Sequence, residues 1–308
     1  MRFGIMVIPY ERWPSFDAMV EVATAAETLG FSDLVFGEHF ATPANGKHES
    51  LGRTWPEIYV LSSFLAAHTE RIRFTYNATV IPYRHPIHQA VEIATLDQLS
   101  KGRLTLITGV GWLEEEFAAL GIPFAQRGAR TDEYVRAMRA IWTNDEAEFH
   151  GTYVSFDKVA VNPKCYQRPA VRTLIGGIGA HARRRIVEYG DGWGSPTPWP
   201  IDKLAREVVR VKDAVAAAGR DPENLYFSAG ISFGEPDPLL AEAFSHVGSI
   251  GSMGIASPAE TIDLIGRYRD IGFTDLILST NWTTPTDLVR RLEVFRSEIL
   301  PSVDGERS

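Results

Sequence analysis

Short apolar runs alternate along the chain with longer segments in which apolar residues recur every three or four positions. Residues 2–8 form the first run, and residues 16–30 follow it with helical spacing and Gly30 as a typical helix stop. Seven further runs are predicted as strands: 33–37, 71–81, 103–110, 171–177, 191–196, 224–232 and 275–280. Helical patterns follow these runs, among them 57–69, 85–102, 113–142, 180–190 and 201–218. The order therefore predicts eight β-then-α units.

Near-continuous apolar strands separated by helices indicate a parallel sheet that is buried on both faces. Eight units in 308 residues favour a closed barrel over an open, doubly wound sheet. Residues 143–170 break the rhythm, because they alternate in character and carry Gly151, which indicates a β-hairpin. We predict an α/β fold: a (β/α)8 TIM barrel with an inserted β-hairpin between units four and five, in one domain over residues 1–308.

Composition and charge restrict the classes of partner. The net charge of −8 argues against nucleic-acid and membrane-surface binding, since both need a basic face. The single cysteine, Cys165, excludes an internal disulfide framework and agrees with a reducing cytoplasm. Residues 1–16 carry a short apolar run broken by Pro9, which is typical of a first strand and not of a signal peptide. We expect a cytoplasmic protein without membrane or nucleic-acid partners.

Polar residues directly after the predicted strands are the candidates for function, because barrel enzymes place their sites at the carboxyl ends of the strands. The run GEHF (37–40) ends the second strand with Glu38 and His39 side by side. His39 is the best candidate for catalysis, since an imidazole exchanges protons near neutral pH. The alternative is that the pair only anchors the loop over residues 40–56.

Three glutamates, residues 114–116, open the helix after the fourth strand. Acids are favoured near a helix N-terminus by the helix dipole, and we expect Glu115 and Glu116 to serve only that purpose. Glu114 is nearest the end of the strand and has the better claim to point into the barrel mouth, although the dipole alone also explains it.

Glycines cluster where the fifth strand meets its helix, in the run IGGIG (175–179). Glycines let backbone N–H groups approach an anion, and a helix N-terminus adds partial positive charge. A phosphate site is one interpretation, with Arg183 to Arg185 a turn or more along the helix. The other is a tight turn beside an exposed basic helix face.

The sequence also raises the possibilities of a metal site and of an aromatic lining at the barrel mouth. The eight histidines show no H-E-x-x-H spacing, but His39 and His48 with Glu38 and Glu49 are an alternative ion-binding set. Aromatic residues expected near the mouth suit a flat apolar ligand, unless they belong to the core: Phe40, Tyr76, Trp112, Trp193, Trp199 and Trp282.

Several of these stretches together resemble the luciferase-like monooxygenase family, whose members are (β/α)8 barrels that bind flavins or the deazaflavin coenzyme F420. The matching stretches are 25–40, 69–112, 127–142, 149–156 and 175–193. The run ATLDQLSKGR is especially characteristic. The resemblance covers most of residues 1–195 and continues more loosely to about residue 300.

Within the family the chain looks most like the F420-dependent branch. The resemblance implies that His39 is the general acid/base and that Glu114 lies near the coenzyme ring. It also implies that backbone N–H groups of Gly176, Gly177 and Gly179 hold the cofactor phosphate.

Two further features follow from the resemblance. Arg130 is similar to a phosphate-contacting arginine of some flavin-binding members. A bulge with a non-prolyl cis peptide supports the back of the ring in this family, and it corresponds here to Asn77, Ala78 and Thr79.

The activity implied is hydride transfer between coenzyme F420 and a small organic substrate. Two alternatives stay open: an FMN-dependent monooxygenase that receives reduced flavin from a partner reductase and uses O2, and a flavin-binding barrel without turnover. F420 and FMN share a tricyclic ring and a ribityl phosphate, so the motifs separate them poorly. Family members are often dimers, and we expect a homodimer in which residues 233–257 cover the substrate.

Overall fold

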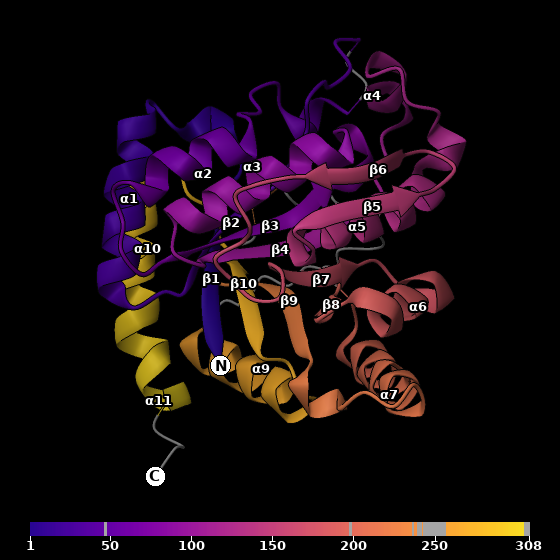
Figure 1. The fold of residues 1–308 in the computed structure, drawn as a ribbon. Helices are drawn as coiled ribbons and strands as arrows, with labels where there is room; N and C mark the ends of the chain where they lie inside the picture. Colours follow the sequence, from indigo (N-terminus) through magenta and orange to yellow (C-terminus); the bar gives the residue numbers. More distant parts are fainter. Residues whose placement is uncertain (46–47, 197–198, 236, 239–241, 243–256, 305–308) are drawn as a thin grey trace.

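A computed structural model describes residues 1–45, 48–196, 199–235, 237–238, 242 and 257–304. Eight parallel strands close into a barrel in the order β1-β10-β9-β8-β7-β4-β3-β2, with β2 paired to β1 and helices around the outside (Figure 1). The strands are β1 (Arg2–Met6), β2 (Asp33–Phe36), β3 (Arg73–Val80), β4 (Leu104–Gly109), β7 (Arg172–Gly176), β8 (Gly192–Gly194), β9 (Tyr226–Ser232) and β10 (Asp275–Ser279). The predicted (β/α)8 barrel is confirmed.

The helices follow the predicted spacing closely. They are α1 (Phe16–Leu29), α2 (Ile58–Ala66), α3 (Pro86–Leu99), α4 (Glu114–Ala119), α5 (Arg127–Thr143), α6 (Gly179–Tyr189), α7 (Ile201–Ala217), α9 (Pro258–Asp270), α10 (Pro285–Val294) and α11 (Leu300–Asp304). Local signals set their ends: the Ser15 hydroxyl accepts a hydrogen bond from the Ala18 N–H, and Gly30 ends α1 with φ 88°. Over the described ranges, none of these helices is both long and apolar enough to cross a membrane.

One predicted helix is two. The pattern over 113–142 predicts a single helix, but α4 ends at Ala119 and α5 begins at Arg127. Gly121 adopts φ 70°, a left-handed conformation that ends a helix, and Pro123 follows it. The break leaves α4 as a short helix after β4. The orientation of α4 determines where its acidic side chains point.

The inserted hairpin is present where the sequence predicts it. β5 (Glu146–His150) and β6 (Ser155–Ala160) pair antiparallel between α5 and β7, outside the barrel (Figure 1). The carboxylate of Glu133, on α5, accepts hydrogen bonds from the backbone N–H groups of residues 152–154 at 2.8, 2.5 and 2.6 Å. A buried acid thus ties the turn of the hairpin to the helix before it.

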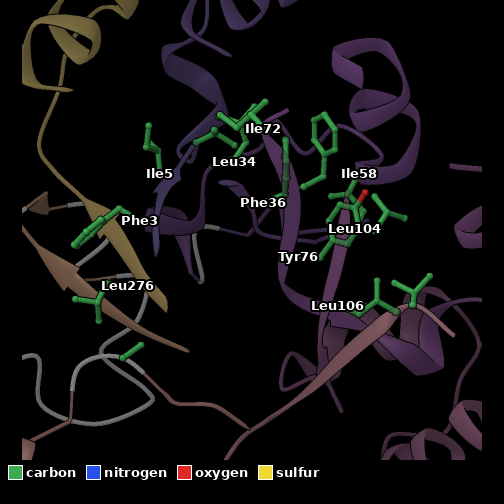
Figure 2. Packing of buried hydrophobic residues seen from close by; sticks show 14 of the residues in the cluster. Phe3, Ile5, Leu34, Phe36, Ile58, Ile72, Tyr76, Leu104, Leu106 and Leu276 are labelled. Carbon is green, nitrogen blue, oxygen red and sulfur yellow. The ribbon is translucent and has the colours of Figure 1, made fainter. Parts of the chain in front are cut away.

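Alternation along each strand divides the core into two layers. Leu34 and Phe36 of β2 point outward and pack under the helices (Figure 2), while Val35 between them points inward. The inner layer is a small cluster of Val35, Ile107, Leu174 and Ile277. Burying such a side chain stabilises the fold by roughly 1.5–3 kcal/mol. Both strand faces are therefore apolar, as a parallel barrel requires.

The amino-terminal end of the barrel is closed by polar side chains. Arg2 forms an ion pair with Asp275, and the Thr75 hydroxyl donates to the Asp33 carboxylate at 2.7 Å. Arg73 donates to the backbone oxygen of Leu104 at 2.8 Å. In barrels of this kind, residues at the amino-terminal end contribute to stability. The active site is therefore expected at the opposite, carboxyl end.

Candidate active site

His39 lies just beyond the carboxyl end of β2, with its side chain buried. Its Nδ1 atom is 2.7 Å from Oε2 of Glu116, the third residue of α4. Neighbouring residues of an extended chain point in opposite directions, and Glu38 contacts a different set of partners, Val80 and Arg84. The two polar residues of the GEHF run therefore have separate surroundings.

The buried carboxylate of Glu116 accepts four hydrogen bonds. Oε2 takes those of His39 and of the Tyr83 hydroxyl, the latter at 2.6 Å. Oε1 takes those of the Phe40 N–H and, at 3.1 Å, of the Ala41 N–H. Burial alone would raise the pKa of Glu116, but the hydrogen bonds from His39, Tyr83 and Phe40 outweigh it and hold the pKa below its ordinary value. The expectation that Glu116 serves only the helix dipole is wrong.

Glu114, the acid chosen from the sequence, opens α4 with an exposed side chain. Successive helix residues are rotated by about 100°, so residues two apart lie on nearly opposite faces. Because Glu116 points toward His39, Glu114 points away from it. The contact of Glu114 with a cofactor ring stays a prediction.

Two tryptophans flank the imidazole of His39. The Trp55 ring, from the segment between β2 and α2, lies 4.7 Å away between centroids, and the Trp112 ring, after β4, lies 5.9 Å away. Both are edge-on, with interplanar angles of 71° and 89°. Nε1 of Trp55 is buried and has no hydrogen-bond partner among the described residues. Trp112 is one of the aromatic residues expected near the mouth, whereas Trp55 is absent from that set.

The other expected aromatic residues divide between core and surface. Tyr76, Trp193 and Trp282 are fully buried and belong to the core. Phe40 is partly exposed, and the Arg84 guanidinium lies 4.5 Å from its ring centroid. Trp199 is partly buried and packs against the core, so the core alternative holds in full for three of the six.

The end of β3 is irregular where the resemblance places a bulge. Pairing with β4 shifts register between Asn77 and Thr79, and the non-prolyl peptide bond between Asn77 and Ala78 is cis. The expectation of such a peptide within residues 77–79 is confirmed. Asn77 and Ala78 are half-buried, whereas Thr79 is fully buried.

A buried polar network holds the chain just after this bulge. Glu38 accepts a hydrogen bond from the Val80 N–H at 2.6 Å, and its other oxygen is 2.6 Å from Arg84. The hydroxyls of Tyr59 and Thr79 are 2.9 Å apart. The network fixes the backbone of the bulge relative to β2 and α2.

The glycine cluster joins β7 to α6. A Cβ at Gly176 would lie 2.7 Å from the Thr108 backbone oxygen, so this position needs glycine for close approach to β4. Gly177 and Gly179 have φ of 92° and 81°, and a Cβ at either would meet no atom within 4 Å. Trp193 donates from Nε1 to the Gly177 oxygen at 2.7 Å, and the N-cap residue of α6, Ile178, supplies no capping hydrogen bond from its side chain.

The three arginines of α6 are paired with carboxylates of neighbouring helices. Arg184 and Arg185 each lie 2.5 Å from Asp132 of α5, and Arg183 lies 2.5 Å from Glu207 of α7. These pairs tie α6 to α5 and α7. The arginines therefore serve helix packing, and the phosphate interpretation rests on the backbone alone.

Arg130, on α5, is held beside the hairpin. Its side chain donates to Gln126 at 3.0 Å and to the Tyr134 hydroxyl at 2.9 Å, and its guanidinium lies 4.7 Å from the Tyr153 ring centroid. The phosphate contact of Arg130 stays a prediction.

The alternative metal set is dispersed. His39 meets Glu116, and the His48 ring packs against Trp112 at 5.3 Å. Over the ranges that the structure describes, no three His, Cys, Asp or Glu side chains lie together as ligands. Most of residues 233–257, expected to cover the substrate, lies outside those ranges.

A closed parallel barrel with a buried histidine and an uncapped, glycine-rich helix start at the carboxyl ends of its strands has the architecture of the barrel enzymes. The family profile for luciferase-like monooxygenases matches residues 1–233. The chain therefore belongs to the luciferase-like monooxygenase family, as the resemblance in its sequence predicts.

Proteins similar to this chain include users of different cofactors. The chain is 27% identical over 321 residues to an FMNH2-dependent dimethylsulfone monooxygenase of Pseudomonas putida, covering 96% of this chain and 84% of that protein. The monooxygenase RslO1 of Streptomyces bottropensis has a TM-score of 0.80 at 25% identity, covering 98% and 99% of the two chains. An F420-dependent secondary alcohol dehydrogenase, solved with an F420-acetone adduct, shares the fold with a TM-score of 0.80 at 19% identity, covering 98% of each chain.

Proposed function

We propose that this protein is an oxidoreductase that transfers hydride between coenzyme F420 and a small organic substrate. The observation that carries the proposal is His39, a buried imidazole at the carboxyl end of β2 whose Nδ1 meets a carboxylate. Hydride transfer to or from a substrate is accompanied by movement of a proton, and a histidine exchanges protons at neutral pH. The resemblance to the F420-dependent branch implies the same role for a histidine at this place.

The backbone at the carboxyl ends of β3 and β7 suits a flavin-like cofactor. Backbone N–H groups at Gly177 and Gly179 lie at a helix start whose N-cap residue supplies no capping hydrogen bond from its side chain, beside open space, and this suits a phosphate group. The half-buried Asn77 and Ala78 form an irregular strand end against which a flat ring can rest. Roles for Glu114 beside the ring and Arg130 on the phosphate remain part of the proposal.

When bound, the deazaflavin supplies the carbon that accepts or gives the hydride. His39 then takes the proton that the substrate loses, or returns it in the opposite direction. Trp55 and Trp112, which meet the imidazole edge-on, would limit the access of water to it and help to orient the substrate. The backbone of residues 77–79, fixed by Glu38, would set the height of the ring relative to His39.

An FMN-dependent monooxygenase is the second candidate. The relative from Pseudomonas putida favours it, because its similarity extends over 96% of this chain and its name states the use of reduced FMN. In that case a partner reductase would supply the reduced flavin, and His39 would stabilise charge on the oxygen being transferred. The same phosphate and ring contacts would serve both cofactors.

Fluorescence titrations of the purified protein with F420, FMN and FAD, side by side, test the proposal. We expect F420 to bind with a Kd at least about tenfold below that of FMN, a difference of about 1.4 kcal/mol. Tight binding of FMN with no response to F420 would overturn the first candidate and favour the second. A His39→Ala variant is the control: it should keep cofactor affinity and lose turnover.

We also propose a homodimer. On α2, Val60 and Phe64 lie one turn apart on the outer face and are 70% and 37% exposed. The rest of this helix is also mainly apolar. A helix that is apolar on its outer face usually packs against a partner. Sedimentation at micromolar concentration should give a dimer for the natural protein and a monomer for Val60→Glu, and a monomer in both would contradict this.

A further inference from the structure

Glu116 forms hydrogen bonds with the segment that carries the proposed acid/base residue, His39. Its carboxylate receives the His39 imidazole at 2.7 Å and the Tyr83 hydroxyl at 2.6 Å on one oxygen. The other oxygen receives the backbone N–H groups of Phe40 and Ala41. Its side chain has no exposed surface. All four groups are therefore fixed in relation to one buried charge, supplied from an element distant in sequence.

The direction of each hydrogen bond follows from the chemistry of the partners. An ionised carboxylate only accepts, and the pKa of Glu116 lies below its ordinary value because its hydrogen bonds outweigh burial. Burial and the adjacent carboxylate raise the pKa of Tyr83, so this hydroxyl keeps its proton and donates. The backbone N–H groups are donors in any case. The proton between His39 and Glu116 therefore belongs to Nδ1.

With its proton on Nδ1, a neutral imidazole carries its lone pair on Nε2, on the far side of the ring from Glu116. Among the described residues, Nε2 of His39 has no hydrogen-bond partner. The Trp55 and Trp112 rings meet the imidazole edge-on and restrict its rotation. Nε2 is thus the atom that can exchange a proton with a substrate.

The other charged groups near His39 are already paired. Glu38, its neighbour in the chain, is 2.6 Å from Arg84, which also pairs with Glu57. Among the described residues, the His48 ring packs against Trp112 and forms no hydrogen bond or ring contact with His39. Glu116 is therefore the titratable group that His39 contacts directly, and the neutral Tyr83 shares the same carboxylate oxygen.

We infer that Glu116 is the positioning residue for His39: it keeps the proton on Nδ1, presents Nε2 to the substrate and offsets the imidazolium charge that forms when the substrate proton arrives. The inference rests on the proposed acid/base role of His39. With the coenzyme bound as the hydride acceptor, Nε2 would take the proton that the substrate loses on oxidation, and Nε2 would return it in the opposite direction. Glu116 neither gains nor loses a proton in either direction.

Nitrogen NMR of histidine side chains in the ligand-free protein tests this without any substrate. The His39 signals, assigned with a His39→Asn variant, should show the Nδ1–H tautomer in the natural protein. In Glu116→Gln the amide can donate to Nδ1 as well as accept from it, so the Nε2–H tautomer should appear beside or in place of the Nδ1–H tautomer. Glu114→Gln, which removes an exposed acid from the same helix turn, should leave the Nδ1–H tautomer unchanged.

A second variant covers the case in which Glu116→Gln does not fold. Tyr83→Phe removes a competing donor from the carboxylate, so the hydrogen bond from His39 should strengthen and the Nδ1–H proton signal should move further downfield. An Nε2–H tautomer in the natural protein, or the same tautomer in Glu116→Gln and Glu114→Gln, would overturn the inference. If F420 fails to bind while the tautomers behave as described, the proposed cofactor is wrong and the role of Glu116 stands.

Discussion

Replacing Glu38 with Gln should destabilise the protein strongly, because this buried carboxylate serves both a backbone N–H group and an arginine. Glu38 is buried, accepts from the Val80 N–H at 2.6 Å and lies 2.6 Å from Arg84. Exchanging the charged acceptor for a neutral one costs about 1 kcal/mol at the Val80 bond. Because Arg84 keeps Glu57 as a partner, the loss of its ion pair with Glu38 should lower the free energy of unfolding by about 2 kcal/mol. A fully broken buried ion pair costs about 3–5 kcal/mol. We expect a total of about 3 kcal/mol.

Calorimetry at neutral pH measures this loss. For 308 residues the entropy of unfolding is about 0.65 kcal/mol/K, so Tm should fall by about 5 °C. Glu57→Gln is the matched control: Glu57 also contacts Arg84, but its side chain is 32% exposed, and Gln can still accept from the Val60 N–H at the start of α2. That control should cost about 0.5 kcal/mol. Equal Tm values for the two variants would refute the buried role of Glu38.

Two further predictions concern the ties between neighbouring elements. Glu133→Ala leaves the three N–H groups of residues 152–154 without their acceptor and should lower the free energy of unfolding by about 3 kcal/mol in urea titrations; a loss below about 1 kcal/mol would contradict this. Burial raises the pKa of Asp132, but Arg185 and Arg184 outweigh it and hold the pKa below the ordinary value of 3.8. The stability from this depressed pKa is present above 3.8 and is lost as the pH falls through the folded-state value, so the gap in unfolding free energy between the natural protein and Asp132→Asn should close in acid. A gap that stays constant with pH would contradict this.

The fold was predictable because its signals are local and repeated. Strands buried on both faces read as apolar runs, and each of the eight lies within the range expected for it. The failure over 113–142 arises because helical spacing continues through the break, and only Gly121 and Pro123 mark it. Such punctuation is weak when the residues on both sides are good helix formers.

The positions of the site residues along the chain were predictable, but the contacts between their side chains were not. His39, the bulge at residues 77–79 and the glycine cluster all follow strand ends, and strand ends can be located from the pattern. Glu114 and Glu116 are both acids in the first turn of one helix, so choosing between them requires the rotation of that helix, which a one-residue change of its start alters by about 100°. Trp55 lies in a segment without periodicity, and no pattern indicated that it reaches His39.

The arginines of α6 show the same limit. Their position after the glycine cluster suggested a contribution to phosphate binding, but Asp132 and Glu207, on other helices, take their charges. Pairing between helices distant in sequence is invisible to a local pattern. What can be read locally is the glycine requirement, which a positive φ at Gly177 and Gly179 bears out.

A crystal structure of the protein grown with F420 tests the central claim most directly. We predict the cofactor phosphate within hydrogen-bonding distance of the backbone N–H groups of residues 177–179, and the deazaflavin ring against Asn77 and Ala78 on the side of His39. A coenzyme bound away from the carboxyl ends of the strands, or one whose ring leaves Nε2 of His39 out of reach of the reacting carbon and its substrate, would contradict the account.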